Sequence, residues 1–286
     1  MSNLDVPTVI RLHNIFSDKG WHSNLGQKTV HQNLSTLLAV LAAEERELIL
    51  ELCERYEWLT YNHYGSLVIE LFQKLVDQGK PVPRKIYIAP VNTISDEKKA
   101  STKSGDSLIY LLSGFIRFLP PPYDRGDYQQ LKLSELVSGK VLLKEDEKIF
   151  FIDDFLGSGN TFKTMYDEII VNTSISTNNI EVLAMVAHQS GIKLLEDMNI
   201  SYSVAKTHAR GISDYYEEPI KSRKIQLMEG IEKNITTNKN YKFGYRKSEG
   251  LVTLIKTPNN TFPFFWMKYK GSKTLDPPFD RFQISK

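Results

Sequence analysis

The sequence predicts an α/β fold built around a parallel β-sheet. Four consecutive apolar residues at 149–152 are typical of a strand that is buried on both faces. Candidate strands at 85–91, 181–187 and 202–205 alternate with helical patterns, which implies parallel pairing with right-handed crossovers. A turn with two glycines follows the strand at 149–152 and leads into a helical pattern at 162–172. Glycines lack a side chain, so a ligand can approach the backbone closely at this turn.

The N-terminal part is predicted to be a helical extension over residues 1–80, followed by an α/β core with an aromatic C-terminal segment over 81–286. Leucines between 29 and 57, and apolar residues over 66–77, follow helical spacing. The extension fits a lid, a dimer surface or a platform for a protein partner, and also plain packing. In the C-terminal segment, the cluster Phe262–Trp266 is typical of a core, although exposed rings there would stack on a base or dock a partner.

The remaining elements are expected in chain order. Residues 92–104 form a polar loop, and 120–139 an irregular segment that opens with three prolines. Further elements are predicted from their apolar spacing: helices at 106–118, 192–198 and 218–234, and a strand at 251–255.

Composition restricts the class of protein. The 286 residues carry a net charge of +2, which indicates neither nucleic acid nor a membrane surface as a partner. Cys53 is the single cysteine, so an intramolecular disulfide framework is excluded. The chain opens without a secretory pattern and has no apolar run long enough to span a bilayer, so a cytoplasmic protein is expected.

The most informative stretch follows the buried strand. Asp153 and Asp154 are predicted to end that strand, and Gly157–Thr161 forms the turn into the next helix. The unpaired amides and the dipole of a helix N-terminus both favour negative charge. The sequence therefore predicts an acidic strand end beside a phosphate cradle.

This stretch has three other interpretations. A Walker B element would require a Gly-x-x-x-x-Gly-Lys-Ser/Thr loop, which the sequence lacks. A dinucleotide fingerprint would require glycine where Phe162 stands. A purely structural strand–turn–helix remains open, although two adjacent acids at a buried strand end carry a cost of desolvation and repulsion.

Residues 149–161 resemble the ribose-phosphate signature of type I phosphoribosyltransferases: a hydrophobic strand, two acids, two further residues and a five-residue phosphate loop. The resemblance implies a phosphoribosyltransferase-like core that binds phosphoribosyl pyrophosphate or a nucleotide. It assigns Asp153 and Asp154 to the ribose hydroxyls as the catalytic pair, with Mg²⁺ held near them through ligand and water rather than by direct protein ligands. It assigns the 5′-phosphate to the loop residues Gly157, Ser158, Gly159, Asn160 and Thr161.

A closer resemblance combines this loop with residues 258–266, Pro-Asn-Asn-Thr-Phe-Pro-Phe-Phe-Trp. The two segments together resemble the phosphoribosyltransferase-like proteins of bacterial conflict and anti-phage defence systems.

Further contacts to the base or the pyrophosphate are expected from other strand ends. In the family the loop after the first core strand binds pyrophosphate, which suggests Lys103 and Ser104. Ligands of open α/β sheets bind beyond the carboxyl ends of the strands, which makes His188, Lys206 and Arg210 candidates. A structural or surface role is the alternative for each of these residues.

The predicted function is transfer of a phosphoribosyl group to an unknown acceptor with release of pyrophosphate. Gly157 stands where purine-type members of the family carry an aspartate, which weakens a purine salvage role and leaves no general base assigned. The alternative is a non-catalytic protein that binds a nucleotide or ribose phosphate, as a regulator or effector of a bacterial defence system. A protein partner or a homo-oligomer fits either interpretation.

Overall fold

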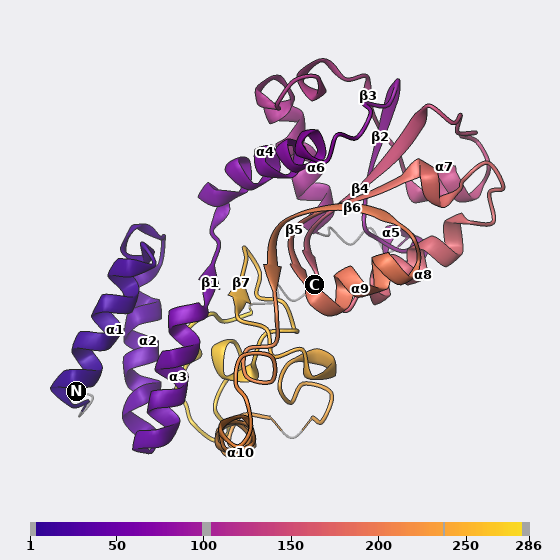
Figure 1. The fold of residues 1–286 in the computed structure, drawn as a ribbon. Helices are drawn as coiled ribbons and strands as arrows, with labels where there is room; N and C mark the ends of the chain where they lie inside the picture. Colours follow the sequence, from indigo (N-terminus) through magenta and orange to yellow (C-terminus); the bar gives the residue numbers. More distant parts are fainter. Residues whose placement is uncertain (1–3, 99–103, 237, 282–286) are drawn as a thin grey trace. The chain divides into compact units, whose positions relative to one another are not determined.

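The computed structural model describes residues 4–98, 104–236 and 238–281. The chain divides into two compact units (Figure 1). We call residues 62–208 the sheet unit, and residues 1–61 with 209–286 the helical unit. This division differs from the predicted one at residue 80, because nearly all of α4 (Tyr61–Asp77) lies in the sheet unit and the aromatic C-terminal segment lies in the helical unit.

The sheet unit contains five parallel strands in the order β3-β2-β4-β5-β6. Their bounds are β2 Lys85–Pro90, β3 Tyr128–Gln130, β4 Glu147–Leu156, β5 Ile180–His188 and β6 Ser201–His208. Strand β4 lies in the centre, where Phe151 pairs in register with Ala89 of β2 and Val182 of β5. The predicted α/β fold with a central parallel strand is therefore confirmed.

Helices cover both faces of this sheet (Figure 1). On one face Phe151 packs with Phe162 and Met165, which belong to the helix leaving β4. On the other face Phe150 lies 6.1 Å from Phe72 of α4, measured between ring centroids. The helices of the unit besides α4 are α5 Ile94–Lys98, α6 Ser104–Phe115, α7 Leu133–Val137, α8 Asn160–Ile169 and α9 Gln189–Asp197.

Strands β4 and β6 run several residues beyond their predicted carboxyl ends. Pairing of β4 with β5 continues through Phe155 and Leu156, so the two acids lie inside the strand near its carboxyl end. Pairing of β6 with β5 continues to His208, which places Lys206 within a strand instead of after it. The segment 120–139 also contains β3 and α7. Tertiary pairing sets these bounds, and local sequence patterns do not report it.

The helical unit is built from α1 Val6–Asp18, α2 Gln27–Val40, α3 Ala43–Arg55 and α10 Ile220–Lys233. The helical pattern over 29–57 is thus two helices, separated at Leu41, which is extended. A two-residue parallel pair joins β1 (Glu57–Trp58) to β7 (Val252–Thr253), where a longer strand was predicted.

An aromatic core holds the helical unit together. Tyr56 stacks on Phe279 with ring centroids 5.0 Å apart, and Phe264 and Phe265 are fully buried. Trp266 is 9% exposed. The prediction that this cluster forms core is confirmed, and Phe264 and Trp266 are not exposed for stacking. Among the described residues, no helix is both long enough and apolar enough to cross a bilayer.

Candidate functional site

The turn between β4 and α8 has the geometry of a helix-capping loop. Gly159 occupies the N-cap position with φ of 75°, in the left-handed region that favours glycine. A Cβ at this position would lie 2.4 Å from Leu194 Cδ2 of α9. The Lys163 amide donates to the Gly159 carbonyl at 2.9 Å, so the amides of Thr161 and Phe162 precede the first bond of the helix. These amides point toward the end where an anion is stabilised.

The paired acids of β4 are held by two different helices. The Ser104 hydroxyl of α6 donates to Asp153 Oδ1 at 2.9 Å, and the Asp154 amide donates to the same oxygen at 2.9 Å. The Tyr64 hydroxyl of α4 donates to Asp154 Oδ2 at 3.0 Å. Asp154 is 8% exposed, whereas Asp153 is partly exposed.

Burial dominates the electrostatics of these acids. It raises the pKa of the Asp153 carboxyl well above its usual range, and the charge of Asp154 raises it further. Burial also raises the pKa of the Asp154 carboxyl, against the hydrogen bonds from Ser104 and Tyr64, which lower it. Because the carboxylates of Asp153 and Asp154 are desolvated and repel each other, binding of a cation or of hydroxyl donors from a ligand stabilises their ionised forms.

The start of α6 comes unusually close to the sheet. A Cβ on Gly105 would lie 2.7 Å from Pro90 Cβ and 2.9 Å from the Ile152 carbonyl oxygen. Glycine therefore allows the helix to approach the ends of β2 and β4, and this approach places Ser104 against Asp153. A second helix N-terminus thus lies beside the acid pair.

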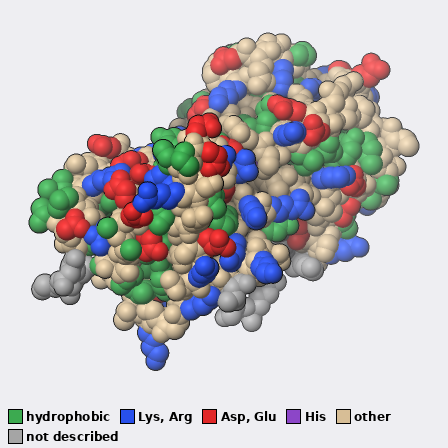
Figure 2. All heavy atoms as spheres, turned by 60° about the horizontal axis from the view of Figure 1, so that its bottom comes forward, with side chains coloured by type: hydrophobic (Ala, Val, Ile, Leu, Met, Phe, Trp, Pro, Cys, Tyr) green, Lys and Arg blue, Asp and Glu red, His purple; other side chains and the backbone are tan. Residues whose placement is uncertain are grey.

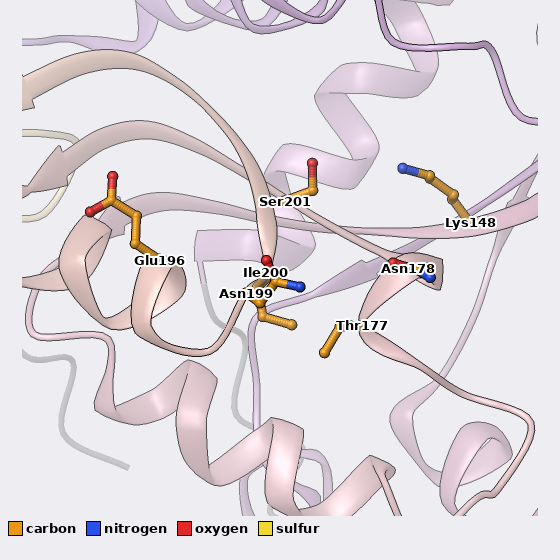
Figure 3. A pocket seen from close by; sticks show the side chains of 7 residues that line it. All are labelled: Lys148, Thr177, Asn178, Glu196, Asn199, Ile200 and Ser201. Atoms are coloured by element: carbon orange, nitrogen blue, oxygen red, sulfur yellow. The ribbon is translucent and has the colours of Figure 1, made fainter.

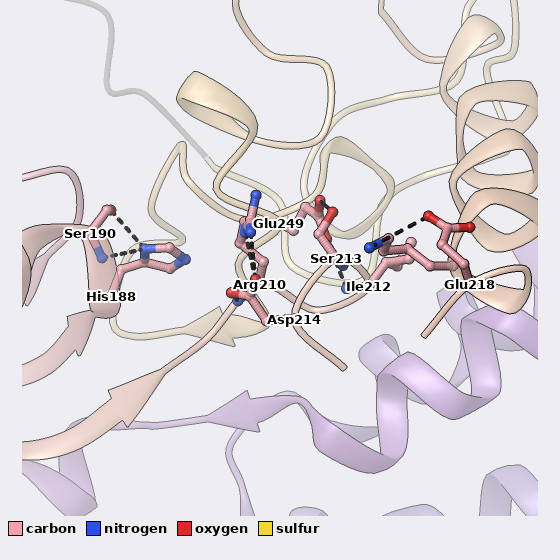
Figure 4. A network of polar contacts seen from close by, with 9 residues as sticks. His188, Ser190, Arg210, Ile212, Ser213, Asp214, Glu218 and Glu249 are labelled. Carbon is pink, nitrogen blue, oxygen red and sulfur yellow. Dashed lines mark hydrogen bonds and ion pairs between the residues drawn. The ribbon is translucent and has the colours of Figure 1, made fainter. Parts of the chain in front are cut away.

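Helix α9 supports the phosphate loop from behind. His188 ends β5 and caps α9, with Nδ1 lying 2.7 Å from Ser190 Oγ and accepting from the Ser190 amide at 3.2 Å (Figure 4). Ser190 Oγ lies 3.5 Å from the Gly157 carbonyl oxygen. A Cβ on Gly191 would lie 2.4 Å from that same oxygen. The structure therefore brings His188 to the loop through α9 and its first turn.

The other candidate residues lie in different places. Lys206 is inside β6, opposite Val186 of β5. Arg210 belongs to the helical unit, where its guanidinium pairs with Asp214 (Figure 4). Lys103 lies outside the described residues. Among the described candidates for base or pyrophosphate contacts, Ser104 donates a hydrogen bond to an acid of the pair.

Sequence reasoning missed several supporting residues. Tyr64 lies 90 positions before Asp154, in an ordinary amphipathic helix, and no local pattern marks it. Ser190 and Gly191 follow the β5 strand end, and the one available signal was a glycine directly before the helix predicted at 192–198. Close backbone approach explains that glycine.

A hollow of about 560 Å³ lies near the amino ends of the strands, away from the carboxyl ends that carry the acid pair (Figure 3). Its lining is mostly polar and comes from the amino ends of β4 to β6: Lys148, Thr177, Asn178, Glu196, Asn199, Ile200 and Ser201. None of the predicted site residues lines it. The acid pair and the hollow are therefore separate features.

The side chains at the acid pair fit a Mg²⁺ ion that is bound partly by substrate and water. They do not fit a metal ion that is held by protein ligands alone. Among the described residues, no group of three His, Cys, Asp or Glu side chains is placed to hold a metal. Mg²⁺ is usually bound through one or two carboxylates, with waters and substrate oxygens completing its shell. Two desolvated carboxylates near the Ser104 hydroxyl fit that pattern.

Comparison with known families agrees with this geometry. A model of the family described as PRTase-CE matches residues 41–281. The chain belongs to the PRTase-CE family. The matched range contains the whole sheet unit, with the acid pair and the phosphate loop, and most of the helical unit. The predicted resemblance to phosphoribosyltransferase-like proteins is confirmed. A comparison with curated proteins gave no match.

Proposed function

We propose that this PRTase-CE protein binds phosphoribosyl pyrophosphate with Mg²⁺ and transfers its phosphoribosyl group to an acceptor. One observation carries the proposal. The carboxyl end of the central strand combines two adjacent acids, of which Asp154 is buried and Asp153 partly exposed, with a glycine-containing helix N-terminus, within a phosphoribosyltransferase-like core. Acids suit the sugar hydroxyls, and helix amides suit the phosphate.

Each part of the site has a distinct role in this scheme. The amides of 158–161 hold the 5′-phosphate, and α9 keeps the loop rigid from behind. Asp153 and Asp154 accept hydrogen bonds from the ribose hydroxyls. The N-terminal turn of α6, which starts at Ser104, faces the diphosphate. This order places the reacting C1 between the acid pair and α6.

The reaction breaks the bond between C1 and a pyrophosphate oxygen, and the leaving group takes the electron pair. A lone pair of the acceptor forms the new bond to C1. Positive charge develops on the sugar as the bond breaks, and the adjacent carboxylates stabilise it. Mg²⁺, held near Asp153 and Asp154, would neutralise charge on the departing diphosphate.

A second candidate function is a sensor that binds the ligand without turnover. Gly157 favours it, because the first loop position offers no side chain that could act as a base. In this case the resemblance to conflict-system proteins would point to an effector or regulator of a defence system. A protein partner would then supply or receive the signal.

Pyrophosphate release separates the two candidates. The wild type is incubated with phosphoribosyl pyrophosphate, Mg²⁺ and a panel of bases, nucleosides and proteins. For a transferase, release occurs with at least one acceptor and falls strongly in Asp153→Asn and Asp154→Asn, because the charge at C1 is no longer stabilised. The matched control is Asp197→Asn, an exposed acid at the end of α9. Ligand binding without release for any acceptor would favour the sensor.

A further inference from the structure

The small net charge of the chain hides a strong asymmetry. Residues 233–281 contain ten Lys and Arg against three Asp and Glu, a net charge of +7 in a chain whose total is +2. The rest of the chain is therefore acidic. Whole-chain charge says little about partners when charge is segregated in this way.

Most of these cations face solvent. We call the eight exposed ones the basic surface: Lys233, Lys239, Arg246, Lys247, Lys256, Lys268, Lys270 and Lys273. Three acids lie in the same range. Glu249 is only 3% exposed, Asp276 pairs with Lys268 at 2.9 Å, and Asp280 is exposed.

Packing within the helical unit gathers residues that are distant in sequence. The Lys270 amide donates to the Asn234 carbonyl at 2.9 Å, and Lys270 Nζ donates to the Lys233 carbonyl at 2.8 Å. The Tyr241 ring lies 5.8 Å from the Trp266 ring. The cations that flank these anchors are therefore brought to one region. Figure 2 shows that many Lys and Arg side chains reach the surface of the face in view, together with acidic ones.

Aromatic rings accompany the cations. Tyr241 and Tyr245 are half-buried, and each is followed directly by a Lys or Arg in the sequence. The Arg246 guanidinium carbon lies 5.6 Å from the Tyr245 ring centroid. Cations that track a phosphate backbone, interleaved with rings on which bases stack, are the combination found in proteins that bind single strands.

We propose that the basic surface binds single-stranded nucleic acid, with lysines on the phosphates and Tyr241 and Tyr245 against bases. This activity lies beyond the phosphoribosyl site and does not depend on it. Amphipathic segments that bind an anionic membrane place an apolar face beside their cations. Among the described residues of 233–281, the one large apolar side chain that is well exposed is Ile255, at 57%. Nucleic acid therefore fits better than a lipid surface.

Fluorescence anisotropy tests the proposal on the full-length protein. The probes are labelled single-stranded RNA and DNA of about 20 nucleotides, longer than typical site sizes, titrated at salt between about 50 and 200 mM. The triple variant Lys233→Gln, Lys239→Gln, Lys273→Gln should lose roughly tenfold to hundredfold in affinity. Its slope of log K against log salt should shrink by about 2, at about 0.7 per lost phosphate contact.

A matched triple variant controls for the removal of charge in general. Lys28→Gln, Lys140→Gln, Lys193→Gln removes three exposed lysines outside the basic surface and should bind like the wild type. Tyr245→Leu should weaken binding while leaving the salt slope unchanged, because stacking releases no counterions. Equal loss in both triples, or no salt-dependent binding by the wild type, would overturn the proposal. So would binding to phosphatidylserine vesicles in preference to both oligonucleotides.

Discussion

Tyr64→Phe isolates a residue that acts on the site through Asp154. The change removes the hydroxyl that donates to Asp154 Oδ2 at 3.0 Å and leaves the ring in place. Asp154 is 8% exposed, so water replaces this bond poorly. A hydrogen bond to a charged group contributes about 1.5–3 kcal/mol, which corresponds to a loss of roughly 10- to 150-fold in ligand affinity.

The loss should depend on pH. The Tyr64 hydroxyl lowers the pKa of the Asp154 carboxyl against the effect of burial. Without it that pKa rises further, so the variant needs a higher pH to ionise the acid that binds the ligand. Affinity for phosphoribosyl pyrophosphate with Mg²⁺ should therefore fall more steeply as pH is lowered in the variant than in the wild type. Isothermal titration calorimetry at a low and a high pH value measures this difference.

Tyr110→Phe is the matched control, because Tyr110 lies on α6 and is 81% exposed. It should bind the ligand like the wild type at both pH values. Thermal melts without ligand establish that each variant is folded. Equal affinities of Tyr64→Phe and the wild type would refute the assignment of Asp154 to the ligand. A uniform loss at both pH values would refute the role of the hydroxyl in setting its ionisation.

Three further changes test the construction of the site. Gly159→Val should lower the free energy of unfolding by about 1–2 kcal/mol because of the left-handed backbone, and calorimetry should detect no ligand binding. Gly20→Val is the control, because Gly20 also has a positive φ but has open space around it. It should destabilise the fold and leave ligand binding unchanged. Gly105→Ala should weaken binding by moving α6 off the sheet, and Gly114→Ala in the same helix should instead stabilise by about 0.5–1 kcal/mol. Asp153→Asn should raise the melting temperature at pH 8. The pKa of this carboxyl is raised in the folded protein, so its ionisation destabilises the fold as pH rises. The same change should abolish ligand binding, because the carboxylate proposed to hold the ribose is lost.

The stability gain of Asp153→Asn should shrink as pH falls below the raised pKa of this carboxyl in the folded protein, and it should disappear below the ordinary aspartate pKa of the unfolded chain, where the acid is protonated in both states. A gain that is constant with pH would contradict the electrostatic cause. Full binding by Gly159→Val would remove the phosphate loop from the account. Identical behaviour of Gly105→Ala and Gly114→Ala would show that the close approach of α6 has no functional role.

The sequence was sufficient to predict the centre of the fold. The apolar run at 149–152 could be satisfied only by burial on both faces, and the glycine turn at 157–159 marked the start of the next helix. Both features are local, which is why they could be recognised. The loop geometry around Gly159 follows from the same reasoning.

Long-range contacts could not be predicted in this way. Tyr64 meets Asp154 because α4 packs on the sheet, and a single amphipathic helix does not reveal which of its residues reaches an acid. The strand extension to Leu156 depends on pairing with β5. The position of α6 depends on the contact of Gly105 with β2 and β4. The residues around Gly105 in the sequence do not predict this contact.

A structure of the protein with phosphoribosyl pyrophosphate and Mg²⁺ would locate the ligand directly. We expect the 5′-phosphate against the amides of 158–161 and the ribose hydroxyls against Asp153 and Asp154. We also expect the diphosphate beside the start of α6, with Mg²⁺ between ligand oxygens and the acid pair. A ligand bound at another place, such as the hollow at the amino ends of the strands, or a phosphate away from the start of α8, would refute the proposed site.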